Sequence, residues 1–564
     1  MRRLQGIAAA PGLAAAPPAV LAPSVGPAGG PQRSLGEAVA EAQRQLDALA
    51  ERLRRAGRTD EAGILEAQSM LAADPELLDG VRRRVASGVA VDEAVRLAGD
   101  EAAEVLERLP DPLLAARGAD LRDVAARLMR ALHNVEPPRL ERRCVVVAAD
   151  LAPSITAELE PSLLAGIVLE GGSPTAHAAI LARALGVPAA VGVLGAVAAA
   201  RGANEVGVDG GTGEVAFNPD SAFLRRVVAW ADARHERQAD DDRLRDEPLV
   251  TADGHRVTLG ANIGRVEEAA PARAAGAEAV GLLRTEFLFT GQASPPDERT
   301  QAAAYEAVLR AFEGDPVVIR LLDVGGDKPL PYLDLAPEAN PFLGVRAIRV
   351  AERRPELLAG QLRAILAAAA AAGVSDPRIM APMVADLGDV RMVHRALAEA
   401  AAAIGLKLGR SLEPHLGVMV EIPSAVLVAD QLAQEVAFFS IGTNDLTQYL
   451  LAADRANPAL ASRQDPMHPA VLRAIASVIR AGAARSVPVA VCGEMAADPV
   501  GAVVLVGLGI SELSMSPASF TAVKRALRSI SLAEAGDLAR ECLDAPDAST
   551  GRRRVAERLG LASG

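Results

Sequence analysis

Apolar residues between positions 35 and 53 recur at alternating steps of four and three, the spacing of one buried face along a long helix. The apolar positions are Leu35, Val39, Ala42, Leu46, Leu49 and Leu53. Ser34 and Glu37 stand at capping-box spacing at the start of this run. Similar helical patterning continues through residues 65–71, 91–98, 102–109 and 121–132. We therefore predict an all-helical subdomain over residues 31–134, with the apolar seam explained by ordinary bundle packing.

Short apolar runs replace the helical pattern after residue 140 and predict buried strands. These runs lie at residues 144–148, 164–169, 186–192 and 205–208. Together with a short early strand, they predict an α/β domain built from residues 1–30 and 135–222. Residues 223–251 are charged and compatible with a helix, so we expect a helical linker there.

The rest of the chain alternates short apolar runs with longer helical ones. The expected strands are residues 257–262, 279–284, 317–322, 378–383, 417–421, 438–441, 487–491 and 512–515. Strands interleaved with helices in this way predict a (β/α)8 barrel over residues 252–540, followed by a C-terminal tail at 541–564. The expected architecture is thus multidomain α and α/β, with a helical subdomain inside an α/β domain and a barrel at the C-terminus.

Polar residues stand repeatedly where the expected barrel strands end. They are Asn262, Arg284, Arg320, Glu421, Asn444, Asp445, Cys492 and Ser514. Because barrels of this type carry their active sites at the C-terminal ends of the strands, this recurrence predicts a functional site at that face.

Four arginines lie in or just after the strand ends, at Arg284, Arg320, Arg346 and Arg455. A single arginine is more often part of a surface ion pair. Several guanidinium groups on one rim suit a small, highly anionic substrate, since arginine binds carboxylate and phosphate in a bidentate manner.

Two carboxylates follow successive strands, at Glu421 and Asp445, and are expected to be neighbours on the rim. Such a pair beside anion-binding arginines suits Mg²⁺, which takes few protein ligands and completes its shell with water and substrate oxygens. The alternative is a pair of carboxylates that the arginines neutralise.

Cys492 ends the seventh expected strand. An unperturbed thiol has a pKa of about 8.5 and is mostly protonated at neutral pH, so it can act as a general acid. A small buried core residue is the other interpretation, and we adopt it for Cys144 and Cys542.

The segment 170–183 (EGGSPTAHAAILAR) places one histidine between a turn-forming run and an apolar helix. His177 is therefore expected at or near a helix N-terminus, where free N–H groups and the helix dipole favour a phosphate. A lone loop histidine is more often structural, so this pattern alone leaves both interpretations open.

Composition narrows the function classes. The net charge of −13 argues against nucleic acid as the main partner. Three scattered cysteines fit a reducing cytoplasm better than a disulfide framework, so we expect a cytoplasmic protein. Pro11, Gly12, Pro17 and Pro18 interrupt the weakly apolar N-terminal stretch, which we interpret as mature protein rather than a signal peptide. No apolar run is long enough to predict membrane insertion.

Taken together, the motifs resemble enzyme I of the bacterial phosphoenolpyruvate:sugar phosphotransferase system. The matching segments are residues 172–183, 281–288 (GLLRTEFL), 323–328 (DVGGDK), 340–346 (NPFLGVR), 418–421, 439–449 (FSIGTNDLTQY), 454–455, 492–494 and 512–516. They cover nearly the whole chain in the order of the family, and the later segments are highly specific.

The resemblance implies transfer of a phosphoryl group from phosphoenolpyruvate to His177, with release of pyruvate. The implied substrate-binding residues are Arg284, Arg320, Arg346, Asn444, Asp445 and Arg455. Mg²⁺ would be held by Glu421 and Asp445, and Cys492 would protonate the enolate. Phosphorylated His177 would pass its group to a histidine of the phosphocarrier protein HPr, docked on the helical subdomain. The family is typically a homodimer through its barrel. Because one histidine must serve two partners, the linker would act as a swivel.

Two positions depart from the family loop, which commonly reads Gly-Gly-x-Thr-Ser-His. Ser173 replaces the second glycine and Ala176 replaces the serine before the histidine. Pyruvate,phosphate dikinases and phosphoenolpyruvate synthases share the loop and the barrel but need a further ATP-binding domain, which the helical region before residue 140 does not resemble. A regulatory protein without turnover is the other alternative, disfavoured by the intact arginine, carboxylate and cysteine set.

Overall fold

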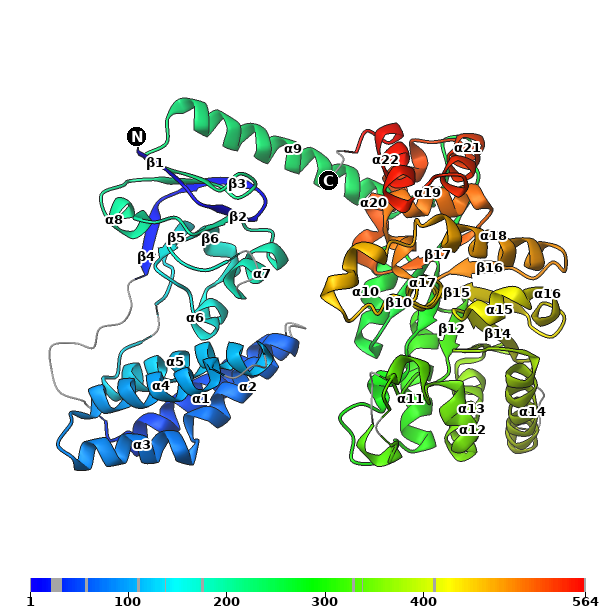
Figure 1. Cartoon of the computed structure of the whole chain (residues 1–564), viewed down its shortest axis with the longest axis horizontal. Helices are drawn as coiled ribbons and strands as arrows, with labels where there is room; N and C mark the ends of the chain where they lie inside the picture. Colours follow the sequence, from blue (N-terminus) through cyan, green and yellow to red (C-terminus); the bar gives the residue numbers. More distant parts are fainter. Residues whose placement is uncertain are drawn as a thin grey trace. The chain divides into compact units, whose positions relative to one another are not determined.

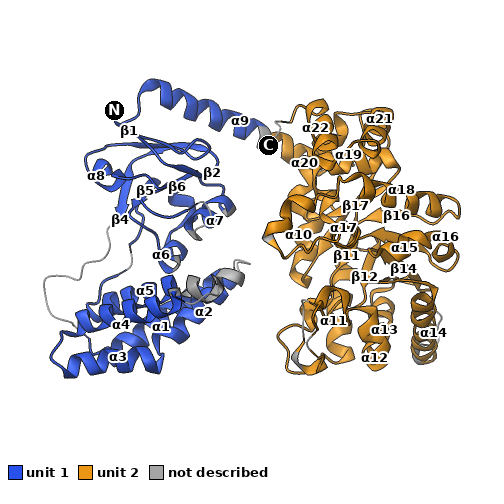
Figure 2. Cartoon of the chain, viewed as in Figure 1, with its two compact units in different colours: residues 1–237 blue, residues 238–564 orange. Residues whose placement is uncertain are grey.

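The computed structural model describes residues 2–21, 33–55, 59–108, 112–136, 138–173, 177–326, 330–336, 338–408 and 412–561. The chain divides into two compact units, residues 1–237 and residues 238–564, which are coloured separately in Figure 2. Within the described residues, no helix is long and apolar enough to cross a membrane.

The helical subdomain of the first unit is an assembly of packed helices, several of which lie side by side in Figure 1. Its helices among the described residues are α1 (Leu35–Arg55), α2 (Thr59–Ala72), α3 (Pro75–Ala86), α4 (Val91–Glu107) and α5 (Pro112–Leu132). At the start of α1 the Ser34 N–H donates to Glu37 Oε2 at 2.9 Å and the Glu37 N–H donates to Ser34 Oγ at 3.4 Å. Ala42 of the apolar seam packs in one core with Leu128, whereas Leu46 packs in another with Leu65. The predicted helices and their cap are confirmed.

Two sheets form the α/β part of the first unit. Their strands are β1 (Arg2–Gln5), β2 (Ile7–Ala10), β3 (Leu13–Ala16), β4 (Pro18–Leu21), β5 (Cys144–Ala148), β6 (Leu164–Leu169), β7 (Ala189–Val191), β8 (Val206–Asp209) and β9 (Glu214–Phe217). One sheet has the order β1-β9-β8-β3 and the other the order β2-β7-β6-β5-β4. Where the sequence led us to expect one early strand, the structure has four, separated by Gly6, Gly12 and Pro17. The early chain alternates between the two sheets, so each short strand pairs with a different neighbour.

Short helices accompany these sheets: α6 (Pro153–Glu158), α7 (His177–Ala184) and α8 (Ala196–Ala200). The helix α7 begins at His177, as the loop pattern predicts. A longer helix, α9 (Ser221–Arg245), runs across the boundary between the two units. Its C-terminal end is fixed by the buried Lys524 ammonium group, which donates to the carbonyls of Leu244 and Arg245 at 2.9 and 2.8 Å.

The second unit is a closed barrel of eight parallel strands. The strands are β10 (Thr258–Ile263), β11 (Ala279–Leu283), β12 (Val317–Arg320), β13 (Arg378–Ala381), β14 (His415–Val420), β15 (Phe438–Ile441), β16 (Val489–Val491) and β17 (Glu512–Met515). Each overlaps the strand expected at that place, so the barrel prediction is confirmed. All of these strands are largely buried on both faces, which explains their continuous apolar runs.

Helices cover the outside of the barrel. They include α10 (Ala269–Ala274), α11 (Glu298–Ala311), α12 (Ile348–Arg353), α13 (Pro355–Ala372), α14 (Leu387–Leu408), α15 (Pro423–Leu427), α16 (Ala429–Leu432), α17 (Thr443–Leu451), α18 (Pro469–Ala483), α19 (Pro499–Leu508) and α20 (Phe520–Arg528). The apolar faces of these helices and the outer faces of the strands share one core.

Two further helices, α21 (Leu532–Leu543) and α22 (Ala548–Arg558), end the described chain. Cys542, Val555 and Ala556 are buried in the barrel core. The segment expected as a tail at 541–564 therefore contains a packed helix, because its apolar residues recur at helical spacing and cover the barrel. The division of the chain into five segments otherwise stays a prediction.

Candidate active site

A cavity of about 520 Å³ opens where the barrel strands end at their C-terminal side. The predicted site residues of the barrel that line it are Arg284, Arg320, Arg346, Glu421, Asn444, Asp445, Arg455 and Cys492. The structure therefore brings together side chains that are more than 200 positions apart in the sequence. Their individual roles remain predictions.

Arg346 lies at the centre of the charged wall and is 1% exposed. Its Nε and Nη2 atoms donate to the two carboxylate oxygens of Asp323 at 2.8 and 2.9 Å. Its Nη1 atom donates to Asp445 Oδ1 at 3.0 Å. Burial by itself lowers the pKa of Arg346, but the neighbouring carboxylates outweigh it and the pKa is raised, so the guanidinium remains charged.

Arg320, at the end of β12, makes a second buried ion-pair group. It donates to Glu286 Oε2 at 3.0 Å and lies 3.3 Å from Asp323 Oδ2. Glu286 also accepts from the Asp323 N–H at 3.0 Å. Since Asp323 pairs with both Arg320 and Arg346, it fixes the spacing of two guanidinium groups in the cavity wall.

Glu421 follows β14 and is 1% exposed. Its Oε1 atom accepts from the Met383 N–H at 2.7 Å. Burial raises its pKa to about 8, and the negative charges of Asp445 and Asp323 add to this effect. The positive charge of Arg320 does not offset the burial of Glu421 and the negative charges around it.

Such a carboxylate is suited to a divalent cation, which would supply the missing positive charge. Glu421 and Asp445 line the same cavity, and the negative charge of Asp445 contributes to the raised pKa of Glu421. Both oxygens of Asp445 also accept from Arg346, at 3.0 and 3.4 Å, but a carboxylate oxygen has more than one lone pair to offer. Among the residues the structure describes, no group of three or more His, Cys, Asp and Glu side chains is placed to hold a metal ion. The carboxylate oxygens of Glu421 and Asp445 are of the kind that Mg²⁺ takes as ligands, so the chemistry of this pair fits that ion.

Cys492 lies on the apolar floor of the cavity, with Leu282 and Met419. Burial raises the pKa of its thiol to about 11, so the sulfur keeps its proton at neutral pH. The Asn262 side-chain amide donates to the Cys492 carbonyl at 2.9 Å, and Ser514 Oγ donates in turn to Asn262 Oδ1 at 2.7 Å. Asn262 and Ser514, both predicted from the sequence as polar residues at strand ends, thus hold the backbone of Cys492 through this chain of hydrogen bonds.

The remaining predicted residues complete the rim. Arg455 lies 3.4 Å from Asp445 Oδ2, and its guanidinium carbon lies 5.3 Å from the centre of the Phe342 ring. Asn444 Oδ1 accepts from the Glu494 N–H at 2.9 Å, which links α17 to the segment after Cys492. Arg284 is exposed at the cavity wall.

Unusual backbone conformations occur beside these side chains. Ala347, directly after Arg346, has φ 53° and ψ −117°, which a residue with a Cβ rarely adopts. Met383, whose N–H binds Glu421, has φ 55°. At Gly493 a Cβ would overlap Thr443 Oγ1 and lie 2.6 Å from Thr443 N, so glycine is required next to Cys492.

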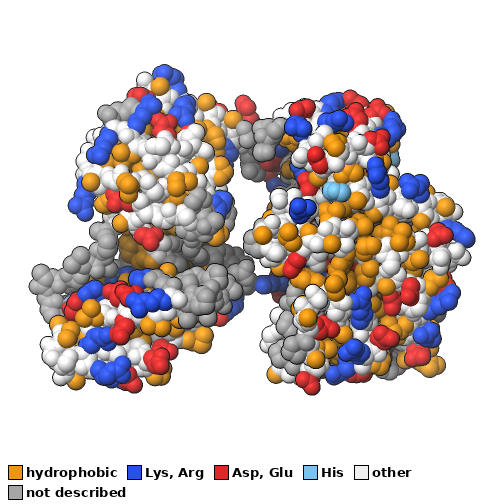
Figure 3. Space-filling model, in the orientation of Figure 1, with side chains coloured by type: hydrophobic (Ala, Val, Ile, Leu, Met, Phe, Trp, Pro, Cys, Tyr) orange, Lys and Arg blue, Asp and Glu red, His pale blue; other side chains and the backbone are white. Residues whose placement is uncertain are grey.

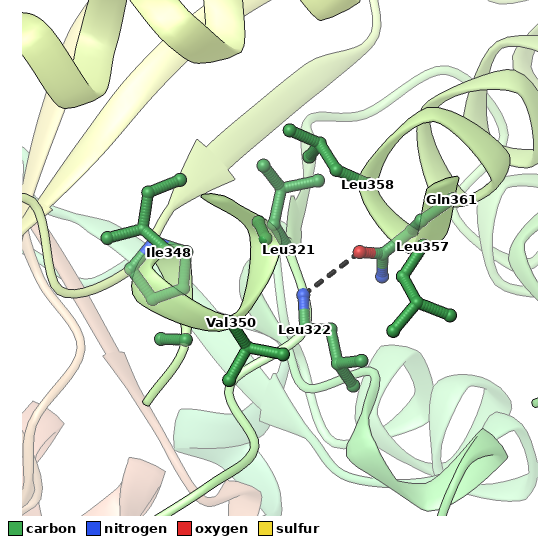
Figure 4. A pocket seen from close by; sticks show the side chains of 10 residues that line it. Leu321, Leu322, Ile348, Val350, Leu357, Leu358 and Gln361 are labelled. Carbon is green, nitrogen blue, oxygen red and sulfur yellow. Dashed lines mark hydrogen bonds between the residues drawn. The ribbon is translucent and has the colours of Figure 1, made fainter. Parts of the chain in front are cut away.

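A buried glutamine supports the wall from outside the barrel. Gln361 of α13 accepts from the Leu322 N–H at 2.9 Å, directly before Asp323, as the dashed line in Figure 4 shows. Its amide nitrogen donates to Thr285 Oγ1 at 3.1 Å, directly after Arg284. The surrounding side chains, such as Leu321 and Leu358, are apolar (Figure 4). The hydrogen bonds of Gln361 therefore hold the segments that follow β11 and β12 in place.

His177 is the first residue of α7 in the other unit, and its side chain lies outside the described residues. So do Ala176 and residues 174–175. Gly172 adopts φ 84°, whereas Ser173 is not among the described non-glycine residues with positive φ. Position 173 is thus not in the left-handed region, and serine can replace the glycine of the family loop there without strain at this φ.

Some residues of the site were not identified from the sequence. Asp323 and Glu286 belong to segments quoted for the resemblance, but their pairing with the arginines depends on contacts between separate strands. Arg552 also lines the cavity, although it comes from α22 near the end of the described chain. No sequence signal marks Arg552, because its neighbours carry no recognisable motif.

Comparisons with known families match three segments of the chain. Residues 5–117 match "PEP-utilising enzyme, N-terminal", residues 140–213 match "PEP-utilising enzyme, mobile domain" and residues 238–532 match "PEP-utilising enzyme, PEP-binding domain", where PEP is phosphoenolpyruvate. The last match contains all the barrel residues predicted from the sequence.

Individual relatives agree with this assignment. The chain is 41% identical over 529 residues to a phosphoenolpyruvate-protein phosphotransferase of Haloferax volcanii, covering 93% of this chain and 91% of the relative. It is 44% identical over 499 residues to one of Streptomyces coelicolor, covering 87% of each chain. A multiphosphoryl transfer protein of Rhodobacter capsulatus is 40% identical over 555 residues, covering 96% of this chain but 66% of that longer protein. The chain thus belongs to the PEP-utilising enzymes, in the family of the phosphoenolpyruvate-protein phosphotransferases.

Proposed function

We propose that this protein transfers the phosphoryl group of phosphoenolpyruvate to His177 and then to a histidine of the phosphocarrier protein HPr, releasing pyruvate. This would be the first step of a bacterial sugar phosphotransferase system. The observation that carries the proposal is the barrel cavity, whose lining includes the four arginines predicted from the sequence, the carboxylates of Glu421 and Asp445, and the thiol of Cys492.

Substrate binding would rest on charge. Phosphoenolpyruvate carries a phosphate and a carboxylate, and Arg284, Arg320, Arg346 and Arg455 offer guanidinium groups to both. Because Asp323 and Asp445 hold Arg346 in place, the cavity is organised before substrate arrives. Glu421 and Asp445 would hold Mg²⁺, which when bound supplies positive charge against the phosphate and carboxylate oxygens. Buried Thr443 and Thr447 hydroxyls lack hydrogen-bond partners and would be available to water or substrate.

The proposed reaction has two steps, phosphoryl transfer to His177 and protonation of the enolate by Cys492. A neutral ring nitrogen of His177 would attack phosphorus, and the bond from phosphorus to the enol oxygen would break. The electron pair left on that oxygen forms the enolate of pyruvate. The Cys492 thiol, protonated because burial raises its pKa to about 11, would then give its proton to the terminal carbon. The proton on the other ring nitrogen of His177 would leave to solvent, and solvent would return a proton to the sulfur.

The partner and the motion follow from the same scheme. One histidine would have to serve both phosphoenolpyruvate and HPr, so α9, the helix that crosses the unit boundary, would act as the swivel. The helices α1–α5 would dock HPr.

A homodimer through the barrel is supported by two exposed leucines, Leu406 at 87% and Leu427 at 83%, and by the hydrophobic side chains gathered on one face of the second unit in Figure 3. The cytoplasmic location stays a prediction.

The test is to incubate the protein with labelled phosphoenolpyruvate and Mg²⁺. His177→Ala should abolish labelling while phosphoenolpyruvate still binds, because the barrel cavity lies in the other unit. His394→Ala is a matched control, since that histidine lies on α14 of the barrel and its Nε2–H donates to the Glu435 carbonyl. Label retained by His177→Ala, or pyruvate phosphorylated with ATP as donor, would overturn the proposal.

A further inference from the structure

The C-terminal helix α22 reaches the active-site cavity, although the match to the PEP-binding domain ends at residue 532. The helix is firmly docked: Asp547 caps it by accepting from the Thr550 N–H at 2.7 Å, and Val555 is fully buried. A Cβ at Gly551 would lie 3.3 Å from Cys542 Sγ, so α22 packs tightly on α21 at this point.

Arg552 is the residue of α22 that lines the cavity. Its Nε and Nη2 atoms donate to the two carboxylate oxygens of Asp465 at 2.9 and 2.8 Å, and its Nη1 atom donates to Asp498. Its side chain is 35% exposed, and the two aspartates are 26% and 29% exposed. One rigid guanidinium group thus joins two loops that approach the cavity from different strands.

The first of these loops leads to Arg455. Asp465 follows the 3-10 turn η6 (Pro458–Arg463), and the adjacent Gln464 donates to the Ala453 carbonyl at 2.8 Å, two residues before Arg455. The Arg455 N–H in turn donates to Gln448 Oε1 at 2.9 Å.

The second loop leads to Cys492. Asp498 ends the 3-10 turn η7 (Glu494–Ala497), which begins two residues after Cys492, and it caps α19 by accepting from the Val500 N–H at 3.1 Å. Movement of Asp498 would therefore shift the segment that sets the position of the thiol.

We propose that Arg552 is a positioning residue, which holds the loop of Arg455 and the loop of Cys492 at the spacing that catalysis needs. It acts without touching the substrate, by bridging Asp465 and Asp498. The reaction it serves is the one proposed above, so the inference rests on that function, but the bridge itself can be tested separately. Residues beyond 532 then belong to the active site rather than to a dispensable tail.

The main variant is Arg552→Ala, and the matched control is Arg558→Ala. Arg558 lies on the same helix and pairs with Glu534, and it does not line the cavity. Both variants remove an arginine of α22 that pairs with carboxylates: Arg552→Ala loses the pairs with Asp465 and Asp498, and Arg558→Ala loses the pair with Glu534. We expect Arg552→Ala to lower kcat for pyruvate release about tenfold, because small misplacements of reacting groups are costly, and Arg558→Ala to leave it unchanged.

Arg552→Lys separates charge from geometry. Lysine keeps the positive charge but lacks the planar fork that reaches both aspartates, so we expect its kcat to stay close to that of Arg552→Ala. It also serves as the test variant should Arg552→Ala fail to fold.

Alkylation of the native protein, mapped by mass spectrometry, gives a readout that is independent of turnover. Cys492 should react faster in Arg552→Ala than in the parent or in Arg558→Ala, because its loop is released. Cys542, buried beneath α22, should remain protected in all three proteins. Faster reaction of Cys542 would show that Arg552 only docks the helix, and would overturn the inference.

The two proposals can fail separately. If the parent protein forms no phosphohistidine, the proposed function is wrong, and the cysteine reactivities still test the bridge. If the parent is active and Arg552→Ala matches Arg558→Ala in both kcat and Cys492 reactivity, the inference about Arg552 alone is wrong.

Discussion

Replacement of Arg346 by methionine tests whether the charged wall of the cavity also holds the barrel together. The arginine is 1% exposed and makes two hydrogen bonds to Asp323, at 2.8 and 2.9 Å, and two to Asp445, at 3.0 and 3.4 Å. Methionine fills a similar space but leaves both carboxylates buried without this partner.

The expected loss of unfolding free energy depends on the ion pairs that Asp323 and Asp445 keep in the variant. Removing one partner of a buried ion pair typically costs about 3–5 kcal/mol. Asp323 keeps Arg320 at 3.3 Å and Asp445 keeps Arg455 at 3.4 Å, so part of each charge stays compensated. We therefore expect a loss near the lower end, about 3 kcal/mol, which is roughly a hundredfold change in the unfolding equilibrium.

Urea unfolding can report the two units separately. The chain has one tryptophan, Trp230, which lies in the first unit against Gly12. Arg346→Met should shift the part of the circular dichroism transition that belongs to the barrel and leave the Trp230 fluorescence transition in place. Arg363→Met is the control, because Arg363 makes a surface pair with Glu298 and should cost less than about 1 kcal/mol.

The double variant Arg346→Met with Asp323→Asn should recover part of the loss, since it removes one of the stranded charges. A loss below about 1 kcal/mol for Arg346→Met, or an equal shift of the Trp230 transition, would show that the buried ion pairs of Arg346 do not stabilise the barrel.

Two further predictions concern protonation. The folded-state pKa of Glu421 is raised from 4.5 to about 8, so the stability that its protonated form contributes is full below about 4.5 and is lost as the pH rises through about 8. Glu421→Gln should therefore gain stability relative to the parent between pH 5 and 8.5, measured by urea unfolding with a chelator present; a constant difference would contradict this. Alkylation of Cys492 should be slow at pH 7 and should rise about tenfold per pH unit toward about 11, because the thiolate is the reactive form. A rate that is flat from pH 7 to 9 would show that the thiol is already ionised.

The barrel could be predicted because its strands are buried on both faces and read as apolar runs between helical segments. Arg284, Glu421 and Cys492 could be selected because each directly follows such a run. Polar residues at the ends of parallel strands converge on one face whatever the details of packing.

The contacts between these residues could not be predicted in the same way. The bridge from Asp323 to Arg346 depends on the turn at Ala347, whose φ of 53° no propensity would suggest. Arg552 enters the cavity from a helix that follows the barrel, and only tertiary packing of α22 brings it beside Asp465. The early strands were underestimated because alanine-rich runs of four residues carry little hydrophobic signal.

Transfer of the phosphoryl group through His177 can be followed directly. The protein is incubated with labelled phosphoenolpyruvate and Mg²⁺, and the labelled residue is located by mass spectrometry before and after addition of HPr. We predict an acid-labile phosphohistidine at His177 that disappears as label reaches HPr, with one pyruvate released for each group transferred. Label on any other residue, or none at all, would contradict it.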